Sequence, residues 1–166
     1  MQDDLITRLK QLHILRRGES SADPSDYYLD IKKACGDAEA FELMANRLGE
    51  KIPNGTNCIA ASGYGGLALA GAVSVIYERN LSLVRTEQKD HGLLKWIEGY
   101  IPSPGDKVTI VNDVFDFLTN GETLQNIIDT IAPTGAEIVG CYVLVKRGEG
   151  KLSVPVEGLL QVKDLL

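Results

Sequence analysis

The sequence predicts an α/β fold, a doubly wound and mostly parallel sheet with flanking helices on both faces. One observation is that short runs rich in β-branched residues, typical of strands buried on both faces, alternate with longer segments of helical period. Another is that polar turns at 62–66, 85–92 and 112–123 each follow one of these strands. Because ligands bind at the carboxyl ends of the strands in such sheets, the three turns should meet along one edge.

Composition is that of an ordinary globular domain, and residues 1–166 are expected to form a single one. The formal net charge of −6 and the lack of any Lys/Arg block argue against nucleic-acid binding. The longest apolar run, around residues 67–77, is too short to cross a membrane, and the acidic start MQDDLITRLK does not resemble a secretory signal. Three widely spaced cysteines without a CxxC pair argue against zinc and for buried thiols in a reducing compartment. A cytoplasmic protein is therefore expected.

The chain should begin with an amphipathic helix, because the leucines of residues 3–15 share one helical stripe. Small polar residues at 18–24 predict a loop, which leads into a short strand at 27–31. Asp37 is suited to cap a second helix. This first part therefore predicts a helix, a strand and another helix.

The middle of the chain alternates strand and helix more regularly. Residues 58–61 predict a buried strand, and residues 67–77 predict a helix that is apolar nearly all round and therefore buried. A strand at 81–85 precedes the charged stretch 86–106, which has no regular period. Loops of that length in compact domains are usually functional or disordered, so a long loop or flap is expected there.

The last part should add the central strand at 107–112 and another buried strand at 136–146. A short strand near 152–156 and a closing helical turn at 162–166 complete the predicted elements.

The segment 108–131 joins a buried strand to a helix through a polar turn that carries Asp113, Asp116 and Gly121. Backbone N–H groups of such a turn and of the first helical turn can converge on an anion. The carboxylates just before them could bind sugar hydroxyls or a hydrated divalent metal, which together suits a phosphorylated sugar. The alternative is an ordinary strand–loop–helix corner with Thr119 or Asn120 as its N-cap.

Five stretches occur in the order found in orotate phosphoribosyltransferases: SDYYLDIKKA, SGYGGLALA, VRTEQKDHG with its downstream IEG, VTIVNDV…TNGET, and LVKRGEG. The most specific is residues 85–92, which resembles the flap motif RKExKDHG of that family. The resemblance covers about residues 10–166. It implies the type I phosphoribosyltransferase fold, with a small N-terminal hood from about residues 1–33 and the C-terminal tail, and a long flexible flap.

The resemblance implies transfer of a phosphoribosyl group from phosphoribosyl pyrophosphate to orotate, a step of pyrimidine nucleotide biosynthesis, with release of pyrophosphate and with Mg²⁺ present. No protein side chain is assigned to the metal. The residues that it assigns to phosphoribosyl pyrophosphate are Arg85, Lys89, His91, Asn112, Asp113, Thr119, Asn120, Gly121, Glu122, Thr123, Tyr64 and Gly65. Of these, Lys89, His91 and Asp113 are expected to be catalytic.

The resemblance assigns Tyr28, Leu29 and Arg147 to the base. In the family the flap crosses a dimer interface, so a homodimer with shared active sites is expected. Without the motif, Lys89 and His91 would be ordinary solvated residues of a charged loop. Arg147 would equally be a solvated charge at a strand end, and Tyr28 would suit packing in the hood.

The sequence departs from the family pattern within 112–118. Asn112 stands where the first of two adjacent acids is usual, and Phe115–Leu118 lengthens the loop by about three residues. We expect these added residues to bulge outward or to pack their aromatic rings under the hood. Whether Asp116 replaces the missing acid is left open.

Two further positions differ: Thr86 and Gly65 stand where lysine is common in the family. A second hypothesis is therefore a binding or regulatory protein of the same fold without turnover. A relative that uses another base is a third.

Overall fold

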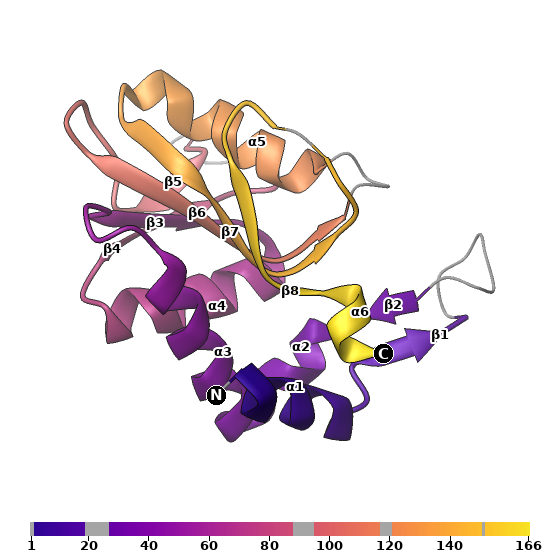
Figure 1. The fold of residues 1–166 in the computed structure, drawn as a ribbon. Helices are drawn as coiled ribbons and strands as arrows, with labels where there is room; N and C mark the ends of the chain where they lie inside the picture. The colour runs from indigo at the N-terminus through magenta and orange to yellow at the C-terminus, as the bar shows by residue number, and fades with distance from the viewer. Residues whose placement is uncertain (1, 19–26, 88–94, 117–120, 151) are drawn as a thin grey trace.

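The computed structural model describes residues 2–18, 27–87, 95–116, 121–150 and 152–166. Within these residues the main sheet has six strands in the order β5-β4-β3-β6-β7-β8 (Figure 1). All neighbouring strands run parallel except the edge strand β5, which is antiparallel to β4. The predicted mostly parallel α/β sheet is thus confirmed.

The elements follow the chain in a mainly alternating order. The strands are β1 (Leu15–Arg17), β2 (Tyr27–Leu29), β3 (Cys58–Ala61), β4 (Asn80–Val84), β5 (Ile97–Gly99), β6 (Lys107–Asp116), β7 (Glu137–Arg147) and β8 (Val156–Gln161). The helices are α1 (Gln2–Gln11), α2 (Ile31–Cys35), α3 (Ala38–Lys51), α4 (Gly63–Ile76), α5 (Glu122–Ile131), the 3₁₀ turn η2 (Ala132–Thr134) and α6 (Val162–Leu165).

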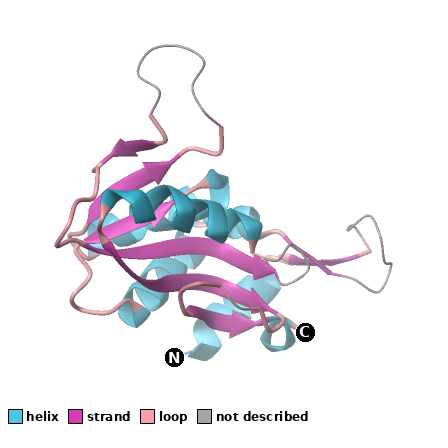
Figure 2. Ribbon diagram, turned by 90° about the horizontal axis from the view of Figure 1, so that it is seen from above, coloured by secondary structure: helices cyan, strands magenta, loops and turns pink. Residues whose placement is uncertain are grey.

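Helices cover both faces of the sheet (Figure 2). On one face, α3 packs against β7, and α4 packs against β3 and β6. On the other face, α5 packs against β6 and β7. Each face has its own buried hydrophobic cluster, and successive strand residues such as Ile59 and Ala60 belong to different clusters because side chains alternate. The apolar face predicted for the helix after the polar turn is confirmed, since Leu124, Ile127 and Ile131 of α5 are buried in the hydrophobic cluster on this face.

A small antiparallel pair, β1 and β2, stands apart from the main sheet (Figure 1). The sequence predicted β2 but neither β1 nor the short helix α2. Both are too short to show a period. α2 begins at Ile31 because the Asp30 carboxylate accepts a hydrogen bond from the Lys33 N–H at 3.3 Å.

β6 continues past Asn112 to Asp116, beyond its predicted end. Its last residues stay paired with β7, Val114 with Val145 and Phe115 with Lys146. The Phe115 ring is 1% exposed and lies in the cluster under α5. The prediction that the added residues bulge outward or pack under the hood is therefore wrong for Phe115, because the extended strand buries its ring on the opposite face. Phe117 and Leu118 lie outside the described residues.

Two further predictions need correction. α4 is a helix as predicted, but it is not buried all round, because Tyr64 and Val75 are 91% and 79% exposed. The stretch 86–106 contains the edge strand β5, where no regular structure was predicted. A strand of this length gives no usable alternation in the sequence.

The amino ends of the strands are held together by Asp106, which is 9% exposed. One carboxylate oxygen accepts from Asn57 Nδ2 at 2.6 Å. The other accepts from Tyr100 Oη and from the Ser103 N–H, both at 2.9 Å. These bonds connect the start of β3 with the chain that returns from β5 to β6, at the edge opposite to the predicted site.

All three cysteines are free, with Cys58 and Cys141 buried and Cys35 half-buried, as predicted for isolated thiols. Burial raises the pKa of Cys141 to about 12. Among the described helices, none combines the length and apolar character that a membrane span requires.

Candidate active site

The turn from β3 into α4 presents a helix N-terminus at the carboxyl edge of the sheet. Ser62 is the N-cap residue with extended backbone, its side chain makes no capping hydrogen bond, and Gly63 starts the helix at φ 72°. The first N–H groups of a helix have no partner within it, and the positive end of the helix dipole adds to them. This turn is therefore suited to bind an anionic group.

Asn112 and Asp113 lie against the first turn of α4, because β6 is the neighbour of β3 in the sheet. A Cβ atom at Gly66 would lie 2.6 Å from Asn112 Oδ1, and a Cβ at Gly65 would overlap the carboxylate of Asp113. Glycine at both positions thus lets the strand end approach the helix start. Gly65, which departs from the common lysine, is explained by this close approach.

The Asp113 carboxylate is largely enclosed. Burial raises its pKa above the usual value, while a hydrogen bond from the Val114 N–H at 3.0 Å and the positive charge of Lys32 act in the opposite direction. The Cys35 thiol lies nearby, and its pKa is raised by burial and then by the charge of Asp113. Asn112 is 6% exposed and donates from Nδ2 to the Val114 carbonyl at 3.0 Å.

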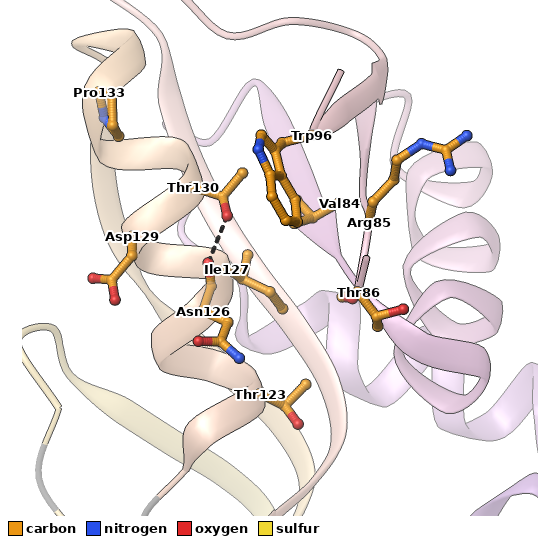
Figure 3. Close-up of a pocket in the computed structure, with 11 residues that line it drawn as sticks. Val84, Arg85, Thr86, Trp96, Thr123, Asn126, Ile127, Asp129, Thr130 and Pro133 are labelled. Atoms are coloured by element: carbon orange, nitrogen blue, oxygen red, sulfur yellow. Dashed lines mark hydrogen bonds between the residues drawn. The ribbon is translucent and has the colours of Figure 1, made fainter. Parts of the chain in front are cut away.

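Arg85 stands directly after β4, at the base of the predicted flap. Its N–H donates to the Trp96 carbonyl at 2.9 Å, so the two strands stay paired at this point. Its guanidinium forms an ion pair with Glu98 at 3.2 Å and points away from α5 (Figure 3). Lys89 and His91, the other predicted cations of this stretch, lie outside the described residues.

The start of α5 provides a second helix N-terminus on the same edge. Gly121 is its N-cap at φ 63°, where a Cβ atom would lie 2.6 Å from the Phe115 ring. Glu122 and Thr123 form the first turn and are exposed. The alternative that made Thr119 or Asn120 the N-cap is wrong, and these two residues lie outside the described part of the chain.

A cavity of about 570 Å³ opens between α5 and the β4–β5 pair (Figure 3). Ser62, Arg85 and Thr123, from the three predicted turns, contribute to its wall, which confirms that these turns meet at one edge. The remaining lining residues are Val84, Thr86, Trp96, Asn126, Ile127, Asp129, Thr130 and Pro133. The Trp96 ring points into this space, toward Thr130, and Asn112 and Asp113 are not part of the wall.

A second cavity of about 560 Å³ lies on the other side of the Val84–Thr86 backbone, toward α4. Tyr64, Leu67 and Leu83 form its apolar wall, and Arg85, Glu87 and Glu98 provide its charges. Tyr64 and Gly65 were predicted to bind the same ligand, but they face different parts of the structure. Tyr64 faces this outer cavity, whereas Gly65 packs on Asp113.

The residues predicted to bind the base gather at the other end of the sheet edge, by the hood. Arg147 Nη1 donates to the Tyr27 carbonyl at 2.8 Å, and the neighbouring Tyr28 is 40% exposed. Leu29 is buried in the cluster on the α3–α4 face, so only its main chain could contact a ligand. Asp116 Oδ2 lies 3.8 Å from Arg147 Nη1.

The sequence did not single out Ser62 or Gly66, although Ser62 immediately before a glycine-rich helix start is an N-cap signal. It also did not connect Asp116 with Arg147, because their pairing depends on the length of β6. Across the described ranges, no group of three or more His, Cys, Asp and Glu side chains could hold a metal ion.

Comparison with known proteins gives a consistent result. The family model described as phosphoribosyl transferase domain matches residues 27–159. An orotate phosphoribosyltransferase of Methanocaldococcus jannaschii is 35% identical over 170 aligned positions, covering 97% of this chain and 94% of the relative. One from Pyrococcus abyssi is 32% identical, covering 99% and 95%. The crystal structure of the Aeropyrum pernix orotate phosphoribosyltransferase has the same fold, with a TM-score of 0.81 at 24% identity over 97% of this chain and 95% of that one.

Proposed function

The chain belongs to the phosphoribosyl transferase domain family and, within it, to the orotate phosphoribosyltransferases, and from this we propose that it transfers a phosphoribosyl group from phosphoribosyl pyrophosphate to orotate. The observation that carries the proposal is the packing of Asp113 against Gly65, which joins a carboxylate to a helix N-terminus. A carboxylate can accept hydrogen bonds from ribose hydroxyls, and a helix N-terminus can bind the adjoining pyrophosphate.

Bond cleavage at C1 of the ribose leaves a cationic ring and a highly charged pyrophosphate. The negative charge that develops on pyrophosphate would be stabilised by the N–H groups at the start of α4 and by the cations Arg85, Lys89 and His91. Asp113 would stabilise the positive ring and hold its hydroxyls. The start of α5, including Gly121, Glu122 and Thr123 with Thr119 and Asn120 before it, would bind the 5′-phosphate.

Mg²⁺ fits this site as a cofactor bound mainly through the substrate. Asp113 is the acid that β6 places beside the glycine turn of α4, and the described residues offer no cluster of three ligands. Pyrophosphate and ribose oxygens would then supply most of the ligands, as is usual for Mg²⁺. When bound, the ion would neutralise charge on the leaving group.

The acceptor base would lie between the hood and the ends of β6 and β7. Arg147 could pair with the orotate carboxylate, and its anchoring to Tyr27 fixes it at this end of the site. Tyr28 and the main chain of Leu29 would cover the base.

A homodimer with shared active sites would explain two features. The guanidinium of Arg85 lies on the α4 side, in the outer cavity, and not in the cavity beside Thr123. The same side carries an exposed apolar surface on α4 and β4, with Tyr64, Val75, Ile76 and Leu83 exposed by 91%, 79%, 45% and 36%. A second copy covering this surface would bury it and would receive Arg85 at its own site.

The decisive experiment mixes the purified protein with orotate, phosphoribosyl pyrophosphate and Mg²⁺. Orotate absorbance should fall while pyrophosphate and the nucleotide product appear in equal amounts, and Asp113→Asn should slow this change about 10²- to 10³-fold. Binding of phosphoribosyl pyrophosphate without any loss of orotate would instead favour the binding-protein hypothesis.

A further inference from the structure

The segment that departs most from the family pattern brings a carboxylate to the base end of the site. Parallel pairing of β6 and β7 continues to its last pair, Asp116 with Arg147. Their side chains lie on the same face as Val114 and Val145, which belong to the hydrophobic cluster on the α3–α4 face, where the hood also lies. Phe115 and Asp116, the first two of the additional residues, therefore extend β6 until Asp116 stands beside Arg147.

The contact between the two residues is electrostatic. Arg147 Nη1 and Asp116 Oδ2 are 3.8 Å apart, which is too long for a hydrogen bond between these atoms. Both side chains are mostly enclosed, with 22% and 25% of their surface exposed, so solvent screens their charges only in part. The orientation of Arg147 is set separately, by its 2.8 Å hydrogen bond to the Tyr27 carbonyl.

We propose that Asp116 is a specificity-determining residue of the acceptor site, where its carboxylate offsets the positive charge of Arg147 and so lowers the preference for an acidic base over an uncharged pyrimidine. The inference rests on the proposed function, in which Arg147 meets the carboxylate of orotate. An incoming carboxylate that pairs with Arg147 must come close to Asp116 and is repelled by it. An uncharged pyrimidine such as uracil experiences no such repulsion.

This role makes Asp116 a different kind of residue from Asp113. In an extended strand four residues span about 13 Å, so Asp116 does not replace the acid missing at position 112. Its charge acts on the base and not on the ribose.

The test compares wild type, Asp116→Asn and Asp116→Glu with orotate and with uracil as acceptors. Asp116→Asn keeps the shape and removes the charge, so KM for orotate should fall about two- to fivefold, the size expected for one partly exposed charge pair. KM for phosphoribosyl pyrophosphate should stay the same, and the preference for orotate over uracil should rise by the same factor. Asp116→Glu, which keeps the charge, should behave like wild type.

Glu137→Gln is a matched control, because it removes one negative charge at the opposite end of β7, where Glu137 lies 3.9 Å from Lys107. It should leave both acceptor constants unchanged. A purely structural role of Asp116 predicts the opposite sign, since loosening Arg147 would raise KM for orotate.

The outcomes separate the inference from the function on which it rests. If wild type converts orotate and Asp116→Asn leaves the orotate-to-uracil preference unchanged or lower, the inference is wrong and the function stands. If neither protein converts orotate or binds it in a calorimetric titration, the proposed function fails, and the assignment of Asp116 fails with it.

Discussion

The carboxylate of Asp113 occupies the space that any side chain at residue 65 would need. Residue 65 lies in the first turn of α4 and Asp113 lies near the end of β6, so this contact joins the two elements that form the centre of the site. The identity of residue 65 is therefore coupled to the position of Asp113.

Gly65→Ala should displace Asp113, lower the melting temperature and reduce kcat/KM by at least tenfold. The added methyl cannot fit unless the strand end or the helix start moves, and misplacement of a site carboxylate weakens transition-state stabilisation. Thermal unfolding of a double-mutant cycle provides the control, because in an Asp113→Ala background the same substitution should cost much less stability. Equal costs in both backgrounds would show that the Asp113 carboxylate is not what excludes a side chain.

Asp113→Asn should lower kcat about 10²- to 10³-fold while it raises the melting temperature at pH 7. Burial raises the pKa of Asp113, so the folded state binds the proton more tightly than the unfolded state does. Stability therefore falls as the pH rises from the ordinary carboxyl pKa through the raised one, and at pH 7 the ionised group opposes folding. Asparagine removes this penalty and can still accept from the Val114 N–H.

The check is the difference in melting temperature between Asp113→Asn and wild type as a function of pH. This difference in melting temperature should shrink as the pH is lowered from the raised pKa of Asp113 to the ordinary carboxyl pKa. If Asp113→Asn is less stable than wild type at pH 7, the predicted direction of the stability change is wrong.

Asp106→Asn should have the opposite effect on stability to Asp113→Asn. The pKa of Asp106 is lowered, first by the hydrogen bond from Asn57 and then by the Ser103 N–H, so its ionised form favours folding. That stability is present above the ordinary carboxyl pKa and is lost as the pH falls through the lowered one. The variant should therefore be less stable than wild type at pH 7 and nearly equal to it at strongly acidic pH, with catalysis affected only through stability.

Val75→Glu should convert a dimer into a monomer without unfolding the protomer. Val75 is 79% exposed on α4, so a charge there is tolerated in a single chain but not against an apolar partner surface. Light scattering at micromolar concentration measures the change, and activity should fall in parallel because the proposed dimer shares its active sites. Lys163→Glu, on the exposed side of α6, introduces the same residue elsewhere and should leave the dimer intact.

Most elements could be predicted from the sequence, and those that were missed, β1, α2 and β5, have three to five residues each. The strands β3 and β7 could be predicted from their apolar runs, and α3 and α5 have enough residues for the helical period to show. Asp37 caps α3 as predicted by accepting from the Ala40 N–H at 2.9 Å. β1, α2 and β5 are held by tertiary contacts that a single segment does not encode. The α4 sequence is apolar on all sides, and nothing within it could show that one side would lie on the protomer surface.

In the candidate site, too, some features could be predicted from the sequence and others could not. The turn positions and Asp113 could be predicted because strand ends in a parallel sheet meet at one edge. Side-chain direction could not be predicted, and Arg85 turns toward α4 because Glu98 on the neighbouring strand pairs with it. The end of β6 was misjudged because Asp113 and Asp116 are unusual in strands, whereas β7 supplies pairing partners up to Arg147.

Phe115 connects that strand end to the turn before α5, which is proposed to bind the 5′-phosphate. Its ring is 1% exposed and fills the space beside Gly121, where the chain takes a positive φ before α5 begins. The ring thus packs against the turn and helps to fix its position. A shorter side chain would leave room for the turn to move, and the N–H groups at the start of α5 would then be less well directed at a phosphate.

Phe115→Leu should therefore raise KM for phosphoribosyl pyrophosphate several-fold while it destabilises the fold by about 1–2 kcal/mol. The matched control is Ile131→Val at the far end of α5, which is fully buried and should cost about 0.5–1.5 kcal/mol. Both variants weaken the same cluster under α5, but only Phe115 touches the turn, so only Phe115→Leu should change KM. Steady-state kinetics well below the melting temperature of each variant separates the two effects. An equal KM in both would show that the turn holds its position without the ring, and that Phe115 serves the core alone.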